Sequence, residues 1–330
     1  SRVQAQHHCL AAADTEAGRA IPSSCPPHSR MVGRSWSALL AALGVAQCAG
    51  LRHGADPKSG EYGLACMKFD KGNMQERVTA IVSTSARAED ASGQGLEVLK
   101  QTVRSIRDVL GLRRAQIVVA WDALPDGENR TRLGTEELPE STAAFYAGKL
   151  RDFEEWNRKE LQSQVTIFQN TEWTHQTEML HRVVEFLVER KKMTPLVYLA
   201  QDDSPVFGDI DVPLILEKLA CDPTVDYVRF LWANDCTEGF APNWNEPCER
   251  HEATDRLHSV SRMSDRPHFA TAHFYLDQIF RRAPRSYRGA PERKCPGIQR
   301  GWLYGERHHM LHERNALENS YNELPGKHRE

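Results

Sequence analysis

The chain has 330 residues, of which 40% are hydrophobic and 26% are charged, and its formal net charge at pH 7 is −3. This composition excludes disorder of the whole chain, because it is ordinary for a globular protein with one large core or two modest ones. Acidic and basic residues are mixed along the chain, so the sequence lacks the charge pattern of a nucleic-acid-binding protein or of one held on an anionic membrane surface.

The N-terminal part of the chain is expected to lie outside the folded domain. Residues 1–30 mix Pro, Ser and His without an apolar period and are expected to be disordered. Residues 31–50 have the layout of a secretory signal peptide, and Met31 is then the expected start. Their apolar run is too short to span a bilayer comfortably, so we expect a cleaved signal or a short anchor and no stable transmembrane span, with a docked amphipathic helix as the alternative. Residues 51–74 are expected to be a linker.

The cysteines fit an oxidising compartment. Five of them follow residue 50, and Cys236 and Cys248 bracket a loop of Gly, Pro and Asn that a disulfide could close. No CxxC pair occurs, which argues against a structural zinc site. Asn129 begins a glycosylation sequon. The sequence therefore predicts a glycoprotein of the secretory pathway, in the Golgi or ER lumen or secreted.

Strand and helix signals alternate from residue 77 onward. The β-branched run 77–86 predicts a buried strand, the apolar spacings of three and four in 95–112 predict a helix closed by Gly111, and 115–127 predicts a second strand. This order is a βαβ unit and implies a parallel sheet. The alternation continues with a helix at 141–160, a strand at 165–170, a helix at 175–192, a strand that ends near 201, a helix at 212–221 and a strand at 226–232. The predicted fold class is therefore α/β, with a mostly parallel sheet flanked by helices in one domain from about residue 75.

The common phosphate-binding and hydrolase motifs are absent. Neither GxGxxG after the first strand nor GxxxxGK[ST] occurs, and GxSxG and HExxH are also missing, which argues against dinucleotide enzymes, P-loop NTPases, serine hydrolases and zinc proteases. What remains is a set of polar residues at the carboxyl ends of predicted strands, where ligands of open α/β sheets bind. The set is Ser83, Ser85, Asp122, Asp202 and Asp203.

The acidic pair after the strand "VYLAQ" is a candidate metal site. Residues i and i+2 of a strand face the same way, so Gln201 and Asp203 could grip one cation, with Asp202 turned away or brought in by the turn. Mg²⁺ and Mn²⁺ favour oxygen ligands and often take one or two protein carboxylates, with phosphates and water completing the shell. The alternative is a polar strand end in which Ser204 and Pro205 serve only to form a turn.

The segments "TAIVSTSARAED", "IVVAWDALPDG" and "LVYLAQDD", in this order, resemble a nucleotide-sugar glycosyltransferase of the GT-A fold, broadly family-2-like, over roughly residues 77–232. The resemblance implies that Ser83 and Ser85 match the first nucleotide loop and Asp122 the acid that contacts the base. It also implies that Gln201-Asp202-Asp203 stands at the DxD motif that binds Mn²⁺ or Mg²⁺ and the diphosphate. The sequence departs from that pattern at Gln201, which stands in place of the first acid.

The C-terminal half supplies the remaining candidates. Some GT-A enzymes, by resemblance, take a metal ligand from a histidine near the C-terminus, and His309 is our candidate. The alternative for this His-rich tail, which its composition favours, is a solvated helix. An inverting transfer needs a carboxylate near the acceptor hydroxyl, and Asp265 and Glu238 are our candidates for this catalytic base. Asp265 is preferred because His268 and Phe269, which follow it, could line an acceptor pocket.

The sequence thus predicts a metal-assisted glycosyltransferase that takes a UDP- or GDP-sugar donor and an unknown acceptor, with a nucleotide-binding half at 75–232 and an acceptor half at 233–330. One alternative is a non-catalytic GT-A-like protein that binds glycan or nucleotide. Another is a nucleotidyltransferase, disfavoured because "STSARAEDASGQG" lacks a Gly-rich basic stretch. A final basic stretch reads either as a solvated loop or as an anion-binding edge, and comprises Arg281, Arg282, Arg285, Arg288 and Arg293.

Overall fold

The structure is a computed structural model, and it describes residues 64–86, 94–125, 141–230, 257–260, 266–282 and 301–304. All of them belong to one compact unit, His53–Glu330. The predicted disordered extension, the predicted signal peptide and the sequon at Asn129 lie outside the described residues. Within the described ranges, no helix is both long enough and apolar enough to cross a membrane.

Eight strands of the described chain form one sheet in the order β3-β2-β1-β4-β7-β5-β8-β6. Strands β3, β2, β1 and β4 are parallel to one another, β7 runs antiparallel between β4 and β5, and β8 is parallel to β5 and antiparallel to β6. Their bounds are β1 Val78–Thr84, β2 Gln116–Trp121, β3 Val165–Gln169, β4 Leu196–Gln201, β5 Tyr227–Phe230, β6 Leu257–Val260, β7 His268–Thr271 and β8 Gly301–Tyr304. The predicted α/β class with a mostly parallel sheet is confirmed.

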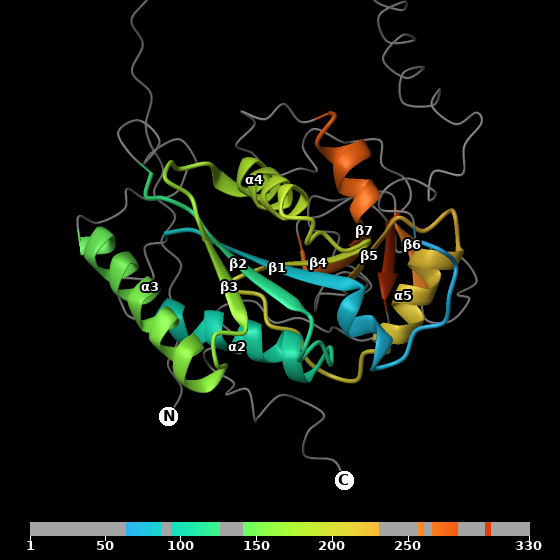
Figure 1. Cartoon of the computed structure of the whole chain (residues 1–330), viewed down its shortest axis with the longest axis horizontal. Coiled ribbons are helices and arrows are strands. Elements are labelled where there is room, and N and C mark those ends of the chain that lie inside the picture. Colours follow the sequence, from blue (N-terminus) through green and yellow to red (C-terminus); the bar gives the residue numbers. More distant parts are fainter. Residues whose placement is uncertain are drawn as a thin grey trace, which may run out of the picture. The chain divides into compact units, whose positions relative to one another are not determined.

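Helices cover both faces of this sheet (Figure 1). The helices α2 (Gln94–Asp108), α3 (Ser141–Glu160) and α5 (Val212–Cys221) pack on one face, while α4 (His175–Glu189) and the π-helix η4 (Phe274–Ile279) pack on the other. Successive strand residues alternate between the two layers, as the two-residue period of a strand requires. In β1, for example, Ala80 and Val82 join the α2 and α3 layer and Ile81 joins the α4 layer.

Helix α2 forms and ends as its sequence predicts. Its apolar stripe is buried on the sheet, with Leu99, Val103 and Ile106 at 0% exposure. Gly111, just after the helix, adopts a φ of +69°, and a Cβ there would stand 3.1 Å from Cε of Met74. Glycine therefore suits this exit both in conformation and in space.

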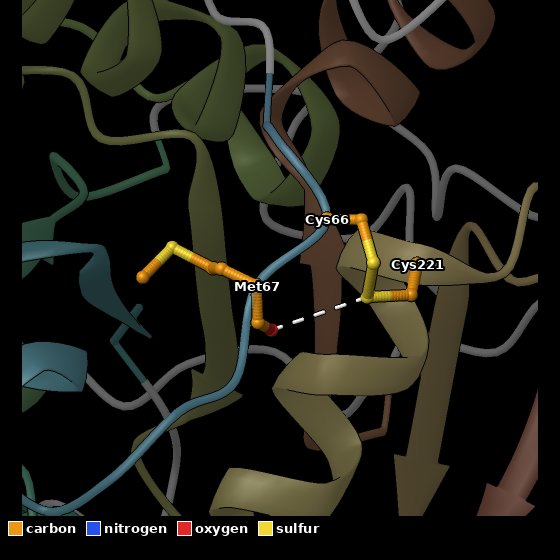
Figure 2. The surroundings of a disulfide bond; sticks show 3 residues. All are labelled: Cys66, Met67 and Cys221. Atoms are coloured by element: carbon orange, nitrogen blue, oxygen red, sulfur yellow. Dashed lines mark hydrogen bonds between the residues drawn. A yellow bond between two sulfur atoms is a disulfide. The ribbon is translucent and has the colours of Figure 1, made fainter.

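The segment before β1 belongs to the domain, so the predicted linker 51–74 is wrong for its described part. Leu64 and Phe69 are buried against the core. A short 3₁₀-helix, η1 (Asn73–Glu76), follows them. Cys66 forms a disulfide with Cys221, the last residue of α5, which fastens this segment to the helix (Figure 2). Cys236 and Cys248 lie outside the described residues, so a bond between them stays a prediction.

Candidate functional site

The strand order reverses direction next to β1, and this reversal defines the candidate site. From β1 the chain steps outward through β2 to β3, and it then returns to place β4 on the other side of β1. Such a switch point is where open α/β sheets bind ligands, beyond the carboxyl ends of the strands. Both β1 and β4 end there, and so does β2 as the next strand along.

Ser83 and Gln201 are register partners at this edge. Both are half-buried, and the Ser83 hydroxyl lies 3.4 Å from the carbonyl oxygen of Ala200, to which it donates a weak hydrogen bond. Ser85 is also half-buried and follows the end of β1. The structure therefore brings Ser83 of the first loop beside Gln201 at the start of the acidic motif.

Asp202 is turned into the protein, away from the sheet edge. Its side chain is 3% exposed, and its Oδ2 lies 3.0 Å from Nζ of Lys149, which is itself 5% exposed. The hydroxyl of Thr84 donates to the same oxygen at 2.5 Å. The sequence left open whether Asp202 turns away from the side of Gln201 and Asp203 or is brought toward it by the turn. In the structure Asp202 turns away. Its role as a metal ligand stays untested.

The main chain of Asp202 is held as firmly as its side chain. Its N–H donates to the carbonyl oxygen of Ser83 at 2.9 Å, which continues the β1–β4 ladder past the last residue of β4. Its carbonyl oxygen accepts a hydrogen bond from the Thr102 hydroxyl of α2 at 2.8 Å. The end of β4 is thus fixed by β1, α2 and α3 together.

Asp203 lies in the turn that follows β4 and is half-buried. Its Oδ1 accepts a hydrogen bond from the hydroxyl of the adjacent Ser204 at 3.0 Å. Asp203 is therefore the less buried acid of the pair.

Asp122, just after β2, caps the N-terminus of α4. One carboxylate oxygen accepts from the N–H and the hydroxyl of Thr174, at 2.9 and 3.0 Å, and the other accepts from the N–H of His175 at 2.7 Å. Negative charge is favourable there, since the first N–H groups of a helix have no partner within the helix. The same carboxylate also accepts from the side chain of Asn170 at 3.4 Å and from the N–H of Ala123 at 3.0 Å.

Burial raises the pKa of Asp122 above its ordinary value, because its side chain is almost fully removed from water. Hydrogen bonds from Thr174, His175 and Asn170 favour the charged form and oppose part of that rise. Contact with a nucleobase, the role that the resemblance implies, would thus use a carboxylate that already has a structural task.

Lys149 is a residue of this site that the sequence reasoning missed. It lies on the buried stripe of α3 with Tyr146 and Phe153. Its Nζ stands 5.9 Å from the ring centroids of both Trp121 and Tyr146, where a cation is favoured by the ring faces. The sequence did contain a signal for this residue, because Lys149 stands at helical spacing between aromatic residues and so falls on the buried face of the helix. A buried lysine requires a partner.

Three predicted site residues, Asp265, Glu238 and His309, lie outside the described part of the chain, and their roles stay predictions. The segment after Asp265 was expected to line an acceptor pocket, but two of its residues are buried within the sheet. His268 and Phe269 are both 0% exposed, because β7 is inserted in the middle of the sheet between β4 and β5.

Within the ranges that the structure covers, no group of three or more His, Cys, Asp or Glu side chains gathers as a metal cluster.

Of the basic stretch near residue 285, Arg281 and Arg282 are described, and both are exposed. Arg281 pairs with Asp277 of η4, as in the solvated alternative for this stretch.

No model of a known protein family matches the chain, and no curated protein matches it in sequence. Solved structures similar to it include the mannosyltransferase PcManGT from Pyrobaculum calidifontis in complex with GDP-Man and Mn²⁺, at 18% identity over 47% of this chain and 35% of that one, with a TM-score of 0.32. GalNAc-T7 with UDP, GalNAc and Mn²⁺ is 12% identical over 70% of this chain and 44% of that one, with a TM-score of 0.43. Glucosyl-3-phosphoglycerate synthase from Mycobacterium tuberculosis, in complex with Mn²⁺, UDP-glucose and phosphoglyceric acid, is 10% identical over 79% and 77%, with a TM-score of 0.38.

These three proteins are GT-A glycosyltransferases, the class that the sequence resembles. The chain spans only 35% and 44% of the first two, well short of their full lengths. At these identities and TM-scores the likeness concerns the outline of the fold, and no residue role is transferred from it.

Proposed function

We propose that this chain is a glycosyltransferase that moves a sugar from a nucleoside-diphosphate donor, a UDP- or GDP-sugar, to an acceptor with the help of Mn²⁺ or Mg²⁺. The observation that carries the proposal is the half-buried carboxylate of Asp203 at the switch point of the sheet, where the ends of β1 and β4 meet. A carboxylate at that position is suited to a metal-bound diphosphate, because ligands of open α/β sheets bind beyond these strand ends.

The donor atoms at this edge fit the metal. Asp203 offers carboxylate oxygens and Gln201 offers an amide oxygen, and hard cations such as Mg²⁺ and Mn²⁺ take such oxygen ligands. A bound metal supplies neutralisation of the negative charge on the departing diphosphate. The protein's own task is then to hold the donor in place, with the hydroxyls of Ser83 and Ser85 directed to the nucleotide.

The remaining roles are also part of the proposal. Asp122 contacts the nucleoside while it caps α4, Asp265 or Glu238 accepts the proton of the attacking acceptor hydroxyl, and His309 completes the metal shell. The Cys66–Cys221 disulfide supports a place in the secretory pathway, because such bonds persist in oxidising compartments.

The test is a thermal-shift series on the full chain with UDP, GDP and their sugars, each with and without Mn²⁺. A ligand that binds only the folded state at about 100 times its Kd adds roughly 2.7 kcal/mol to the free energy of unfolding. We expect this stabilisation in the wild type and in Asp209→Asn, a matched control at an exposed acid of the same loop. Asp203→Asn should lose the Mn²⁺-dependent part. Undiminished Mn²⁺-dependent binding by Asp203→Asn would refute the assignment.

The non-catalytic binding protein remains a second candidate, favoured by Gln201 in place of the first acid. A binding protein would hold nucleotide or glycan without breaking the glycosyl bond. Release of free UDP or GDP from a donor sugar in the presence of Mn²⁺, measured with a coupled nucleotide assay, separates the two, because only the transferase produces it.

A further inference from the structure

We infer that Lys149 is a positioning residue of this site, and that its charge makes Asp202 an internal anchor, so that Asp203 carries the metal without Asp202. The inference rests on the proposed function, since it divides the tasks of the two neighbouring acids. It starts from one observation: a lysine and an aspartate, each about 95% or more buried, face one another at 3.0 Å directly beneath the strand ends.

The Asp202 carboxylate is already committed within the protein. Its Oδ2 accepts from both Lys149 and Thr84. A metal ion bound to the same small group would lie close to the lysine ammonium, and two cations at close range in a buried setting repel strongly. Asp202 can therefore serve the lysine or a metal, and the structure has it serving the lysine.

The anchor acts on the metal site through the main chain. Asp202 is joined by one peptide bond to Gln201 and by another to Asp203, so a shift of Asp202 moves both. Its side chain is held by Lys149 from α3, its carbonyl oxygen by Thr102 from α2, and its N–H by the Ser83 carbonyl of β1. These contacts fix the turn before any ligand arrives. Outer partners of this kind commonly tune a metal site without touching the ion.

Charge balance explains why the anchor needs a lysine. A buried carboxylate is costly without a partner, and removal of one member of a buried pair leaves the other charge uncompensated. In Lys149→Met the long apolar stem is retained, but Asp202 loses its cation. We expect the Asp202 side chain to move toward water, which would pull the turn and Asp203 out of place.

The experiment measures Mn²⁺-dependent binding of UDP and of GDP to the full chain by calorimetry, at a temperature where unfolding curves show each variant to be folded. Lys149→Met should weaken this binding by roughly 10- to 100-fold, the usual effect of losing an outer partner of a metal site. Lys149→Met combined with Asp202→Asn removes both charges and keeps the main-chain contacts, so it should recover most of the lost affinity. Lys159→Met is the matched control, because Lys159 lies on the same helix and pairs with Glu155 in an exposed bridge; it should bind like the wild type.

Two results would overturn the inference. Binding by the double variant that is as weak as in Asp203→Asn would mean that Asp202 is itself a ligand. Tighter Mn²⁺ binding in Lys149→Met than in the wild type would mean that the lysine competes with the metal for Asp202. If the wild type binds neither nucleotide with Mn²⁺, the proposed function fails; the buried pair is then still tested by unfolding, where the double variant must be more stable than Lys149→Met.

Discussion

His268 makes the stability of the fold depend on pH in a direction that the structure determines. The imidazole lies in β7 at 0% exposure, with Nδ1 2.5 Å from the carbonyl oxygen of Arg266 and Nε2 paired with the hydroxyl of Tyr275. The carbonyl can only accept, so Nδ1 carries the proton and Nε2 accepts from the tyrosine. Burial, helped by the nearby charge of Arg229 and opposed in part by the bond to the Arg266 carbonyl, lowers the pKa of His268 to about 4.

The size of the effect follows from the two states of the histidine. In the unfolded chain the ordinary pKa is about 6.5, so between pH 6.5 and 4 the unfolded state binds a proton that the folded state does not. The contribution of His268 to stability is therefore fully present above pH 6.5 and is lost as the pH falls toward 4. One pKa unit corresponds to about 1.4 kcal/mol, so a fall from pH 7 to pH 5 should remove about 2 kcal/mol from the free energy of unfolding.

The assay is urea unfolding followed by tryptophan fluorescence at pH 7, 6 and 5, with the disulfide intact. His268→Gln is the comparison, because glutamine can both donate and accept a hydrogen bond but does not titrate in this range. We expect the variant to be less stable at pH 7 and to lose about 2 kcal/mol less than the wild type between pH 7 and pH 5. Equal losses in the two proteins would refute the proposed protonation state of the buried histidine.

Three further predictions concern stability, each measured by urea or thermal unfolding. Asp122→Ala should cost about 1–2 kcal/mol, because the first N–H groups of α4 lose their acceptor; an unchanged unfolding midpoint would contradict the capping role. Replacing both Cys66 and Cys221 by Ser should cost up to about 5 kcal/mol, since the bond closes a loop with a sequence separation of 155; a variant as stable as the wild type would show that the bond adds nothing. The Tyr198 hydroxyl is buried with no hydrogen-bond partner in the described structure, so Tyr198→Phe should raise stability by about 1 kcal/mol, and a loss would reveal a partner for that hydroxyl.

The parallel half of the sheet is predictable from the sequence because each of its elements carries its own periodic signal. The helix predicted at 141–160 is α3 with the same bounds, and the strand predicted at 165–170 is β3, Val165–Gln169. Short-range patterns suffice for such elements, and the βαβ order then dictates parallel pairing. The meeting of Ser83 and Gln201 at one edge follows from that pairing, and the structure confirms it.

The other half is less predictable because its contacts join distant and very short segments. Strand β7 has four residues and inserts between β4 and β5, a pairing that no local signal specifies. The bond between Cys66 and Cys221 likewise depends on the packing of the N-terminal segment beside α5. Spacing alone drew attention to Cys236 and Cys248 instead, because a cysteine pattern does not determine which residues pair.

The acids at the strand ends show why residue type at a position is a weaker guide than the side chain's direction. Asp122 and Asp202 both follow a strand as predicted, yet both are buried. Asp122 binds the N-terminus of α4. Asp202 binds Lys149, which is 53 residues away in sequence. Along β4 the alternation is regular, and Tyr198 and Ala200 point into the α2 and α3 layer. Asp202 continues that alternation and therefore points into the same layer, whereas Asp203 follows in the turn at the sheet edge. The period of the strand thus already separates the buried acid from the half-buried acid in the turn, and the buried lysine explains why the buried residue can be an acid at all.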